Sequence, residues 1–367
     1  MPKKKKSVQI NQSRARHGYS PEQKAEMTSV RRRWHLGTIK HFFLVVFTLI
    51  LSCALLLFML SYQIFVGPSQ AGSDLLIQTL MESSAMKFYP YLFLRDEQVE
   101  AALERNRVIS SDEDTDTSLI TIKSRDSVSG ADASEDESIK DIEIVPVNGS
   151  TFKGYMMIVQ DPSRVSVGVC RYPFRTDKEG LKVDEIIDKY GAVAGINAGG
   201  FVDTGGHGNG GMPIGMVYSE GEQLNKANKE YKTVVGFDQN DVLHVGEFSD
   251  EKAKEIGLRD AVAFGPALLI NGQPSVVSGK GSGLNPRSAI GQRADGAVLL
   301  LSIDGRQANS LGASYEDLIE IMLKFGAVNA CNLDGGSSTA MFYNGEQIND
   351  GLGITSGRSL PTAWIVK

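Results

Sequence analysis

The chain has 367 residues, of which 41% are hydrophobic and 22% charged, and its net charge at pH 7 is −6. This length allows two or three domains. The charge is unevenly distributed, because residues 1–40 hold 11 Lys and Arg against two Glu, and the remainder carries a net charge of −15. So acidic a remainder is a poor partner for nucleic acid through bulk charge. We therefore expect no nucleic-acid partner, and any bound anion must be held by local groups.

An apolar stretch follows the basic tail. Residues 42–66 contain no charged side chain over 25 positions, whereas a membrane-spanning helix needs about 20 apolar residues. The basic flank predicts a cytoplasmic tail at 1–40, a transmembrane signal-anchor at 41–66 and an extracytoplasmic remainder, in a single-pass protein of the cell membrane. A cleaved signal peptide is the alternative, with Ser69–Ala71 as its small-residue site. The apolar stretch is longer than a typical signal core, which favours an uncleaved anchor.

Two polar segments separate this stretch from the rest of the chain. Residues 67–108 predict a juxtamembrane helical segment that is broken near Pro90. Residues 109–140 are strongly acidic and have few large apolar side chains. Because such a segment buries too little surface to offset its ordering entropy, we expect an acidic flexible linker there.

The remaining residues, 141–367, are numerous enough for one hydrophobic core. Short apolar runs alternate with glycines, which predicts an α/β (α+β) domain with a mixed sheet. Helices are expected at 183–190 and 315–325, the second capped by Ser314. Asn271-Gly272 and Asn344-Gly345 predict hairpin turns. Strands are expected in the runs YMMIVQ, RVSVGVC, GAVAGIN, TVVGFD, PALLING, AVLLLSID, AVNACNLD, TAMFYNG and TAWIV.

The chain contains two segments of similar sequence, called echoed segments below. KYGAVAGINAGG at 189–200 aligns without a gap on KFGAVNACNLDGG at 324–336. The alignment matches Asn197 with Asn332 and Gly200 with Gly335. We infer two similar helix–strand units whose strand ends point at one site.

Polar clusters follow three apolar strands, in GINAGGF, LLLSIDGRQ and CNLDGGSS. Glycine-rich turns at strand ends are common places for functional groups. Asp304 and Asp334 lie at two of these ends, and a pair of carboxylates suits attack at a sugar carbon. Arg287 and Arg306 suit forked binding of phosphate. A turn role for Asp304 and a surface ion pair for Arg287 are the structural alternatives.

The sequence lacks the motifs of serine hydrolases and of zinc sites. The chain has no G-x-S-x-G elbow around Ser337 or Ser338, no H-E-x-x-H, and too few Cys and His for a zinc cluster. His207 is a lone histidine in a glycine-rich loop. Cys170 and Cys331 lie in the extracytoplasmic part, where a disulfide and two buried thiols are both possible.

The ordered motifs GINAGGF, FGPALLINGQ, RSAIG, LLLSIDGRQ, the block from GASYEDL to NLDGGSS, and LPTAWIV resemble the phosphodiester glycosidase family. The domain is that of the lysosomal "uncovering enzyme", N-acetylglucosamine-1-phosphodiester alpha-N-acetylglucosaminidase. The resemblance covers about residues 140–367. The anchor, helical segment and linker resemble those of bacterial members associated with exopolysaccharide.

The resemblance implies hydrolysis of a sugar-1-phosphodiester, of the α-N-acetylglucosamine-1-phosphate type, on a phosphorylated glycan. It also implies that the active site is lined by Asn197, Arg287, Asp304, Arg306, Asp334, Ser337 and Ser338. From the chemistry of the side chains we assign catalysis to Asp334 first and Asp304 second. Substrate binding is assigned to Asn197, Gly199, Gly200, Arg287, Arg306, Asn332, Gly335, Gly336, Ser337 and Ser338. We expect no cofactor and no metal ligand, although a divalent cation such as calcium stays possible.

Two other functions fit the same residues. One is a metal-dependent phosphodiesterase that cuts the P–O bond, with Asp304 and Asp334 on the cation. The other is a non-catalytic module that binds polysaccharide and scaffolds other proteins.

Overall fold

The computed structural model describes residues 20–122, 141–229, 232–279, 281–350 and 357–367. The chain divides into two units, Met1–Gln63 and Ile64–Lys367. Residues 1–19 of the predicted basic tail and residues 123–140 of the predicted linker lie outside the described residues.

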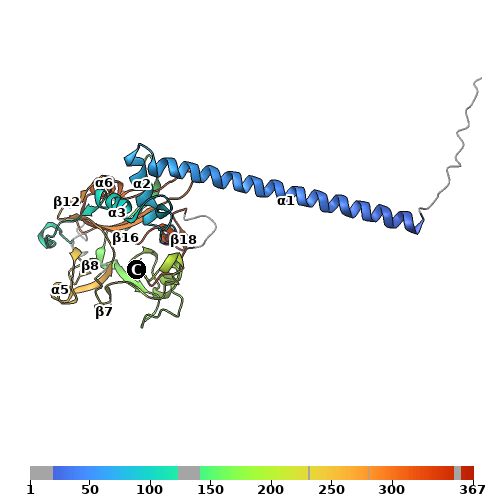
Figure 1. The fold of residues 1–367 in the computed structure, drawn as a ribbon. Helices are drawn as coiled ribbons and strands as arrows, with labels where there is room; N and C mark the ends of the chain where they lie inside the picture. Colours follow the sequence, from blue (N-terminus) through green and yellow to red (C-terminus); the bar gives the residue numbers. More distant parts are fainter. Residues whose placement is uncertain (1–19, 123–140, 230–231, 280, 351–356) are drawn as a thin grey trace, which may run out of the picture. The chain divides into compact units, whose positions relative to one another are not determined.

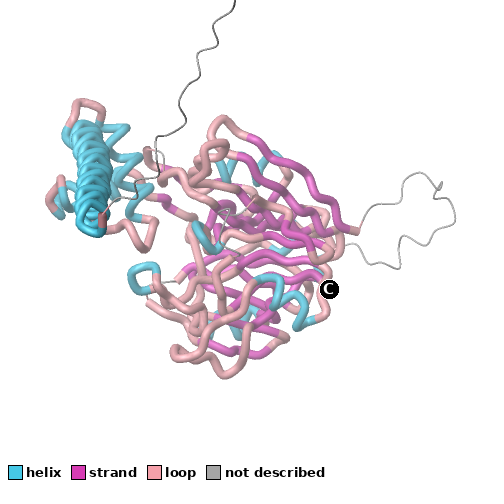
Figure 2. Tube along the Cα trace, turned by 90° about the vertical axis from the view of Figure 1, so that its right-hand side faces the viewer, coloured by secondary structure: helices cyan, strands magenta, loops and turns pink. Residues whose placement is uncertain are grey.

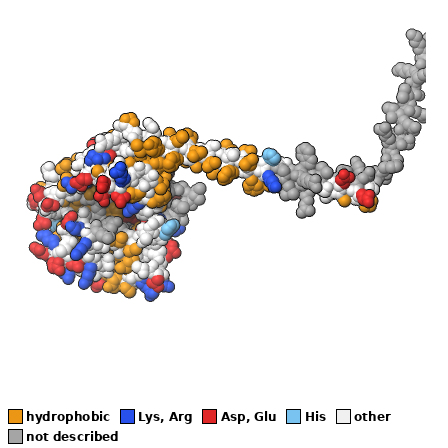
Figure 3. Space-filling view, in the orientation of Figure 1, with side chains coloured by type: hydrophobic (Ala, Val, Ile, Leu, Met, Phe, Trp, Pro, Cys, Tyr) orange, Lys and Arg blue, Asp and Glu red, His pale blue; other side chains and the backbone are white. Residues whose placement is uncertain are grey.

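Helix α1 (Pro21–Val66) contains the predicted apolar stretch. Thr38–Val66 is long and apolar enough to cross a membrane, and none of its most apolar window is buried against protein. Figure 3 shows hydrophobic side chains along this part of the helix. Anchors and signal sequences share these properties, so the orientation in a membrane stays a prediction.

Two short helices follow. They are α2 (Gln70–Met81), capped by Ser69, and α3 (Asp96–Arg105), with Pro90 in a 3-10 turn between them. Ile77, Val99 and Ala102 are fully buried where α2 and α3 pack together. The segment therefore has a small hydrophobic cluster of its own.

Residues 109–122 are not the free linker that the sequence predicts. The Asp116 amide donates to Asn271 Oδ1 (2.7 Å), and the Thr121 amide donates to the Ala294 carbonyl (2.8 Å). Ile120 is 6% exposed. A few backbone hydrogen bonds and one apolar anchor are enough to hold this acidic stretch on the domain, which composition alone does not reveal.

The largest sheet has seven strands and is central to the second unit. Every strand pair among the described residues is antiparallel, so the expected α/β (α+β) class is confirmed but without the mixed strand directions we expected. In spatial order the strands are β12 (Gln273–Pro274), β11 (Ala267–Ile270), β16 (Ala327–Leu333), β14 (Arg287–Arg293), β15 (Val298–Ile303), β3 (Lys153–Val159) and β2 (Ile142–Asn148).

Two five-stranded sheets and one short ladder complete the unit. The first runs β7 (Glu222–Asn225), β6 (Val217–Ser219), β10 (Leu258–Ala263), β8 (Thr233–Asp238) and β9 (Leu243–Glu247). The second runs β18 (Glu346–Gln347), β17 (Met341–Tyr343), β5 (Ala194–Asn197), β19 (Thr362–Val366) and β4 (Val165–Val169). The ladder pairs β1 (Val108–Ile109) with β13 (Val276–Val277). Figure 2 shows the strands gathered in the middle of the unit.

The seven-stranded sheet is buried on both faces. In β15, Leu300 points into a core shared by all three large sheets, whereas Leu299 and Leu301 point into a second core under a helix. This is why the sequence shows an uninterrupted apolar run there instead of alternation. Trp364 and Phe237 join the two five-stranded sheets in the shared core, with ring centroids 5.7 Å apart.

Three helices cover the sheets at their outer faces. The helices α4 (Val183–Tyr190) and α6 (Tyr315–Lys324) occur where the sequence predicts them, and Ser314 caps α6. Helix α6 covers the second core of the seven-stranded sheet, and α4 packs on β19 and β5. The third, α5 (Asp250–Ile256), packs near β10. In the view of Figure 1, α2, α3 and α6 lie above β16, and β7, β8 and α5 lie below it.

Candidate active site

A cavity of about 400 Å³ opens where β16, β14 and the turn after β15 end beside the residues that follow α2. The structure brings nine of the expected site residues into its wall and leaves Asn197, Gly199 and Asp304 outside it. The nine are Gly200, Arg287, Arg306, Asn332, Asp334, Gly335, Gly336, Ser337 and Ser338.

The two echoed strand ends meet beneath this cavity. The Asp334 amide donates to the Ala198 carbonyl (3.0 Å), and Asn197 Nδ2 donates back to the Asp334 carbonyl. Asn197 Oδ1 accepts from Ser288 Oγ (2.7 Å) and from the Ala340 amide (3.2 Å). Asn197 is therefore a fully buried brace between the two sheets, and it sets the position of Asp334 through the backbone.

Asp334 is the most perturbed acid of the wall. Its Oδ1 accepts from the Gly335 amide (3.0 Å), whereas Oδ2 is buried with no hydrogen-bond partner among the described residues. Burial raises the pKa of the Asp334 carboxyl to about 6. Interactions with Ser338 and with the Gly335 amide lower this pKa but do not offset the effect of burial. A carboxyl that titrates near neutrality and has an unused oxygen is suited to act as a base or nucleophile.

Arg287 starts β14 and is only 5% exposed. Its Nη2 donates to Ser282 Oγ (2.8 Å), to the Gly283 carbonyl (3.0 Å) and to Glu82 Oε2, and the guanidinium lies 4.2 Å from the Tyr315 ring centroid. Burial alone would lower the pKa of Arg287, but the charge of Glu82 and the Tyr315 hydroxyl raise it overall. The wall thus holds a permanent cation.

Arg306 is held far less tightly. It lies in the turn after β15 with a left-handed φ of 57°, and its Nη2 donates to Asn285 Oδ1 (3.0 Å). Partial burial and the positive charge of Arg287 lower its pKa. A Cβ at Gly336 would lie 3.4 Å from this guanidinium, so the second glycine of NLDGG lets the backbone approach the arginine closely.

Asn332 contributes a second buried oxygen without a partner. Its Nδ2 donates to the Gly265 carbonyl (2.8 Å), whereas Oδ1 is buried and unpartnered among the described residues. Buried polar atoms without partners are uncommon in folded proteins. Two of them in one cavity wall, at Asn332 and Asp334, mark a place where a polar ligand completes the hydrogen bonds.

Asp304 takes up a different position. It is 3% exposed, and its carboxylate accepts from Asn349 Nδ2 (3.1 Å) and from the Asp350 amide (3.3 Å). The side chain therefore holds the loop at 349–350 and does not line the cavity. Sequence reasoning placed Asp304 at a functional strand end, and the structure turns it toward a neighbouring loop.

Sequence reasoning missed several wall residues. Asp203 and Arg358 form a bidentate pair (2.7 Å for both bonds), which lowers the pKa of Asp203 to about 2. Arg358 also lies over the Phe201 ring, 4.7 Å from its centroid. Asn285 could have been found from the sequence, because it stands two positions before the predicted site residue Arg287. Nothing in the sequence around Glu82 indicates that this residue lines the cavity.

The other candidates lie elsewhere. His207 lines a separate cavity of about 210 Å³. Cys170 and Cys331 are both free and buried, and burial raises the pKa of each thiol. Within the described part of the chain, no three His, Cys, Asp or Glu side chains group as metal ligands.

Residues 190–367 match the family model described as phosphodiester glycosidase. This part of the chain is similar to phosphodiester glycosidase domains. The match leaves out β2, β3 and β4, although these strands pair with β15 and β19 in the sheets of the same domain.

The phosphodiester glycosidase domain has two curated relatives. The uncharacterized protein YomE, derived from the SPbeta prophage of Bacillus subtilis, is 30% identical over 165 residues, 43% of this chain and 25% of YomE. The Bos taurus N-acetylglucosamine-1-phosphodiester alpha-N-acetylglucosaminidase is 39% identical over 62 residues, 17% of this chain and 12% of the bovine protein. The matches thus span a quarter of the length of these relatives or less.

A solved structure shares the fold. It is the catalytic domain of the zebrafish N-acetylglucosamine-1-phosphodiester alpha-N-acetylglucosaminidase, auto-inhibited by its pro-peptide, with a TM-score of 0.51 and 19% identity. The similarity covers 61% of this chain and 81% of the zebrafish chain.

Proposed function

We propose that the protein hydrolyses the glycosidic C–O bond of a sugar-1-phosphodiester, of the α-N-acetylglucosamine-1-phosphate type. The observation that carries this proposal is the shared cavity, whose wall joins the Asp334 carboxyl to Arg287 and Arg306. Hydrolysis at an anomeric carbon with a phosphoryl substituent needs a carboxylate near the carbon and cationic groups near the phosphoryl oxygens. The family match and the name of the bovine relative support the same reaction.

Asp334 carries the attack in this proposal. Its ionised carboxylate either removes a proton from a water molecule that attacks the anomeric carbon, or attacks that carbon itself before water releases the sugar. The electrons of the broken C–O bond stay on the phosphate oxygen, which leaves as a phosphomonoester. One water is consumed, its hydroxyl ends on the sugar, and its proton reaches solvent.

The arginines stabilise the leaving group. A phosphomonoester is already a stable anion, so it needs little protonation, and the guanidinium groups of Arg287 and Arg306 balance the charge that develops on it. The Ser337 amide is a further donor for a phosphoryl oxygen, because the amides of Gly335, Gly336 and Ser338 already donate to oxygens of the protein. Asn332 Oδ1 is free to accept from a sugar hydroxyl. We assign Asp304 and Asn197 to holding the architecture around the site.

We further propose that α1 anchors the protein in a cell membrane with the basic tail inside the cell and the glycosidase domain outside. The supporting observations are the 29-residue apolar stretch and the basic residues before it. A phosphorylated cell-surface glycan or exopolysaccharide is the substrate that such a location supplies.

Hydrolysis in heavy-oxygen water by the detergent-solubilised full chain tests the reaction. We expect the label in the free sugar, because water adds to carbon. Label in the phosphate would mean P–O cleavage and would refute the proposal. The same assay with a chelator tests the metal alternative, since the proposed chemistry needs no metal at Asp334.

A further inference from the structure

Residues 81–87, which follow helix α2, form part of the cavity wall although they lie outside the matched glycosidase residues. Glu82, Ser83, Ser84 and Lys87 line the same cavity as the glycine-rich turn at 335–338. The cavity keeps its volume of about 400 Å³ with these residues in place. The segment therefore bounds the cavity and does not fill it.

The segment is built into the domain on both sides of the cavity. On one side, a Cβ at Gly283 would lie 2.2 Å from the backbone of Thr79, and the Leu284 amide donates to Thr79 Oγ1 (3.2 Å). On the other side, a Cβ at Gly206 would lie 3.2 Å from Ala85. These contacts, to the Thr79 backbone and to Ala85 Cβ, show that α2 and the residues after it pack closely against the domain.

Helix α3 and strand β1 fix the same segment from behind. The Asp74 carboxylate in α2 accepts from Arg105 (2.8 and 3.1 Å) and from Asn106 Nδ2 (3.2 Å). The next residue, Arg107, accepts at its carbonyl from the Ser278 amide (3.0 Å), where β1 joins β13. The chain thus runs continuously from the cavity wall into a ladder of the glycosidase domain.

One carboxylate oxygen connects this segment to both arginines. Glu82 Oε2 accepts from Arg287 Nη2 and from Asn285 Nδ2 (2.6 Å). The same Asn285 amide accepts at Oδ1 from Arg306 Nη2 (3.0 Å). Glu82 therefore sets the Arg287 guanidinium directly and the Arg306 guanidinium through a single amide, whose orientation it decides.

The charge of Glu82 also favours keeping both guanidinium groups in the cavity wall. Arg287 and Arg306 are close enough for the charge of one to disfavour that of the other, and Glu82 acts in the opposite sense on both. Without Glu82, the almost fully buried Arg287 would be a cation with only neutral acceptors around it, which is costly. We expect its guanidinium to leave the cavity for other acceptors in that case.

We propose that residues 81–87 are a structural wall of the active site and that Glu82 is a positioning residue, which holds Arg287 and Arg306 in place for the phosphoryl group. This inference rests on the proposed function. It makes the active site a joint product of the glycosidase domain and the segment that follows α1, which also brings Ser83, Ser84 and Lys87 to the cavity wall.

The test compares Glu82→Gln and Glu82→Asp with the wild-type full chain in detergent. For a sugar-1-phosphodiester we expect Glu82→Gln to raise KM roughly 10- to 100-fold, the effect of losing a charged hydrogen bond, and to change kcat less. Glu82→Asp keeps the charge and should recover part of the loss. Glu104→Gln is the matched control, since Glu104 lies in the neighbouring helix α3 and forms an exposed pair with Arg107.

Binding of inorganic phosphate, read as the rise in Tm that it causes, separates this inference from the reaction. In one outcome, the wild type is inactive while phosphate raises its Tm more than it raises the Tm of Glu82→Gln. That result would refute the proposed function but support the role of Glu82 as a positioning residue. If the wild type is active and Glu82→Gln keeps its KM and its phosphate response, the wall is refuted. Faster turnover in Glu82→Gln would also refute it, because the carboxylate would then obstruct the site.

Discussion

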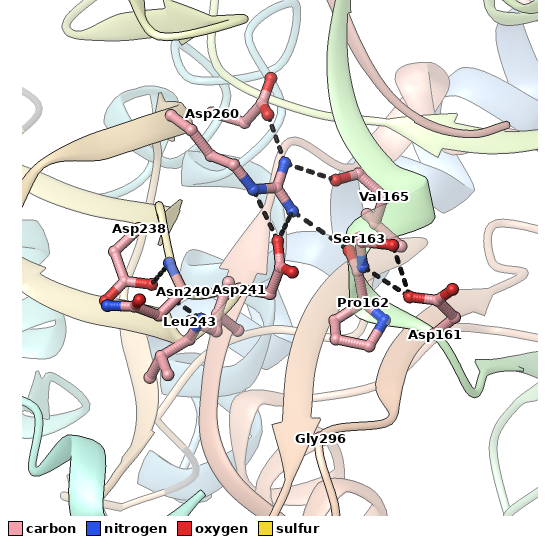
Figure 4. A network of polar contacts seen from close by, with 12 residues as sticks. Asp161, Pro162, Ser163, Val165, Asp238, Asn240, Asp241, Leu243, Asp260 and Gly296 are labelled. Atoms are coloured by element: carbon pink, nitrogen blue, oxygen red, sulfur yellow. Dashed lines mark hydrogen bonds and ion pairs between the residues drawn. The ribbon is translucent and has the colours of Figure 1, made fainter. Parts of the chain in front are cut away.

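Two arginine clusters of the domain differ in how completely their partners are supplied. Arg259 donates to Asp241 (2.9 and 2.8 Å), to Asp260, and to the carbonyls of Val165 (2.9 Å) and Pro162 (3.1 Å). Figure 4 labels these four partners. Every edge of this guanidinium meets an acceptor from the protein. Such a cluster joins strands and has no capacity left for a ligand.

Arg306 of the cavity has fewer partners. Its guanidinium has one hydrogen bond among the described residues, to Asn285, and two buried oxygens in the same wall, at Asn332 and Asp334, have none. Since buried polar groups are normally satisfied, this shortage indicates a site whose hydrogen bonds are completed by substrate. Arginine–carboxylate proximity alone therefore does not indicate function, and atoms without partners do so here only because they lie in a cavity wall beside arginines, since others such as Trp364 Nε1 lie elsewhere.

Replacing Asp334 by Asn should have the largest effect. The amide cannot act as base or nucleophile, so we expect kcat to fall about a thousandfold or more while the protein stays folded. Steady-state kinetics checks this, and Asp241→Asn in the Arg259 cluster is the control that should keep its kcat. Retention of polymer phenotypes by folded Asp334→Asn would instead favour a binding module.

Replacing each arginine by Met should separate the two clusters. Arg259→Met removes the cationic partner of the buried Asp260 and of the partly exposed Asp241, and it should lower the free energy of unfolding by about 3 kcal/mol without changing kcat/KM. Arg306→Met should do the reverse, lowering kcat/KM roughly 100-fold with little change in stability. Denaturant unfolding and kinetics on both variants measure this, and equal effects would erase the distinction.

The pH dependence follows from Asp334. Since burial raises its pKa from 3.8 to about 6 and the ionised form is the active one, kcat/KM should rise with pH up to about 6 and then level off. Between pH 7 and pH 5 we expect a decrease of about tenfold. Circular dichroism at pH 5 shows whether the fold persists, and a flat profile down to pH 4 would speak against this role for Asp334.

The smallest effect concerns stability. In the unfolded chain Asp334 ionises near 3.8 but in the fold only near 6, so the protein loses stability as pH rises through this window. Asp334→Asn avoids this loss and should be more stable than the wild type at pH 7, on the order of 2 kcal/mol. At pH 3.5, where both side chains are mostly neutral, the difference should vanish. A less stable variant at pH 7 would contradict the expected cost of the charge.

Local features were predictable. The sequence predicted helix α4 from its spacing of apolar residues, and the Asn271-Gly272 and Asn344-Gly345 turns from residues that tolerate left-handed φ, here 54° and 75° and then 50° and 80°. The sequence also indicated Arg306, in the turn after an apolar strand, and Arg287, for the forked binding of phosphate that a guanidinium offers, and both line the cavity. These inferences need only a few neighbouring residues.

Long-range features were not predictable. Whether a strand-end carboxylate points into a cavity depends on what packs beside it, and for Asp304 the neighbouring loop at 349–350 decided this. Residues 109–122 are docked by single hydrogen bonds to distant residues such as Asn271 and Ala294. No local pattern encodes such a partner.

The sequence by itself determined the apolar helix, many elements of the domain, the family resemblance and nine residues of the cavity wall, because periodicity, turn chemistry and ordered motifs are properties of short stretches. Only the tertiary structure decided that Glu82 meets Arg287 across 205 positions of sequence, and that Asp334 keeps a buried oxygen without a partner. The physical reason is that hydrogen-bond satisfaction and burial belong to the packed arrangement of distant segments.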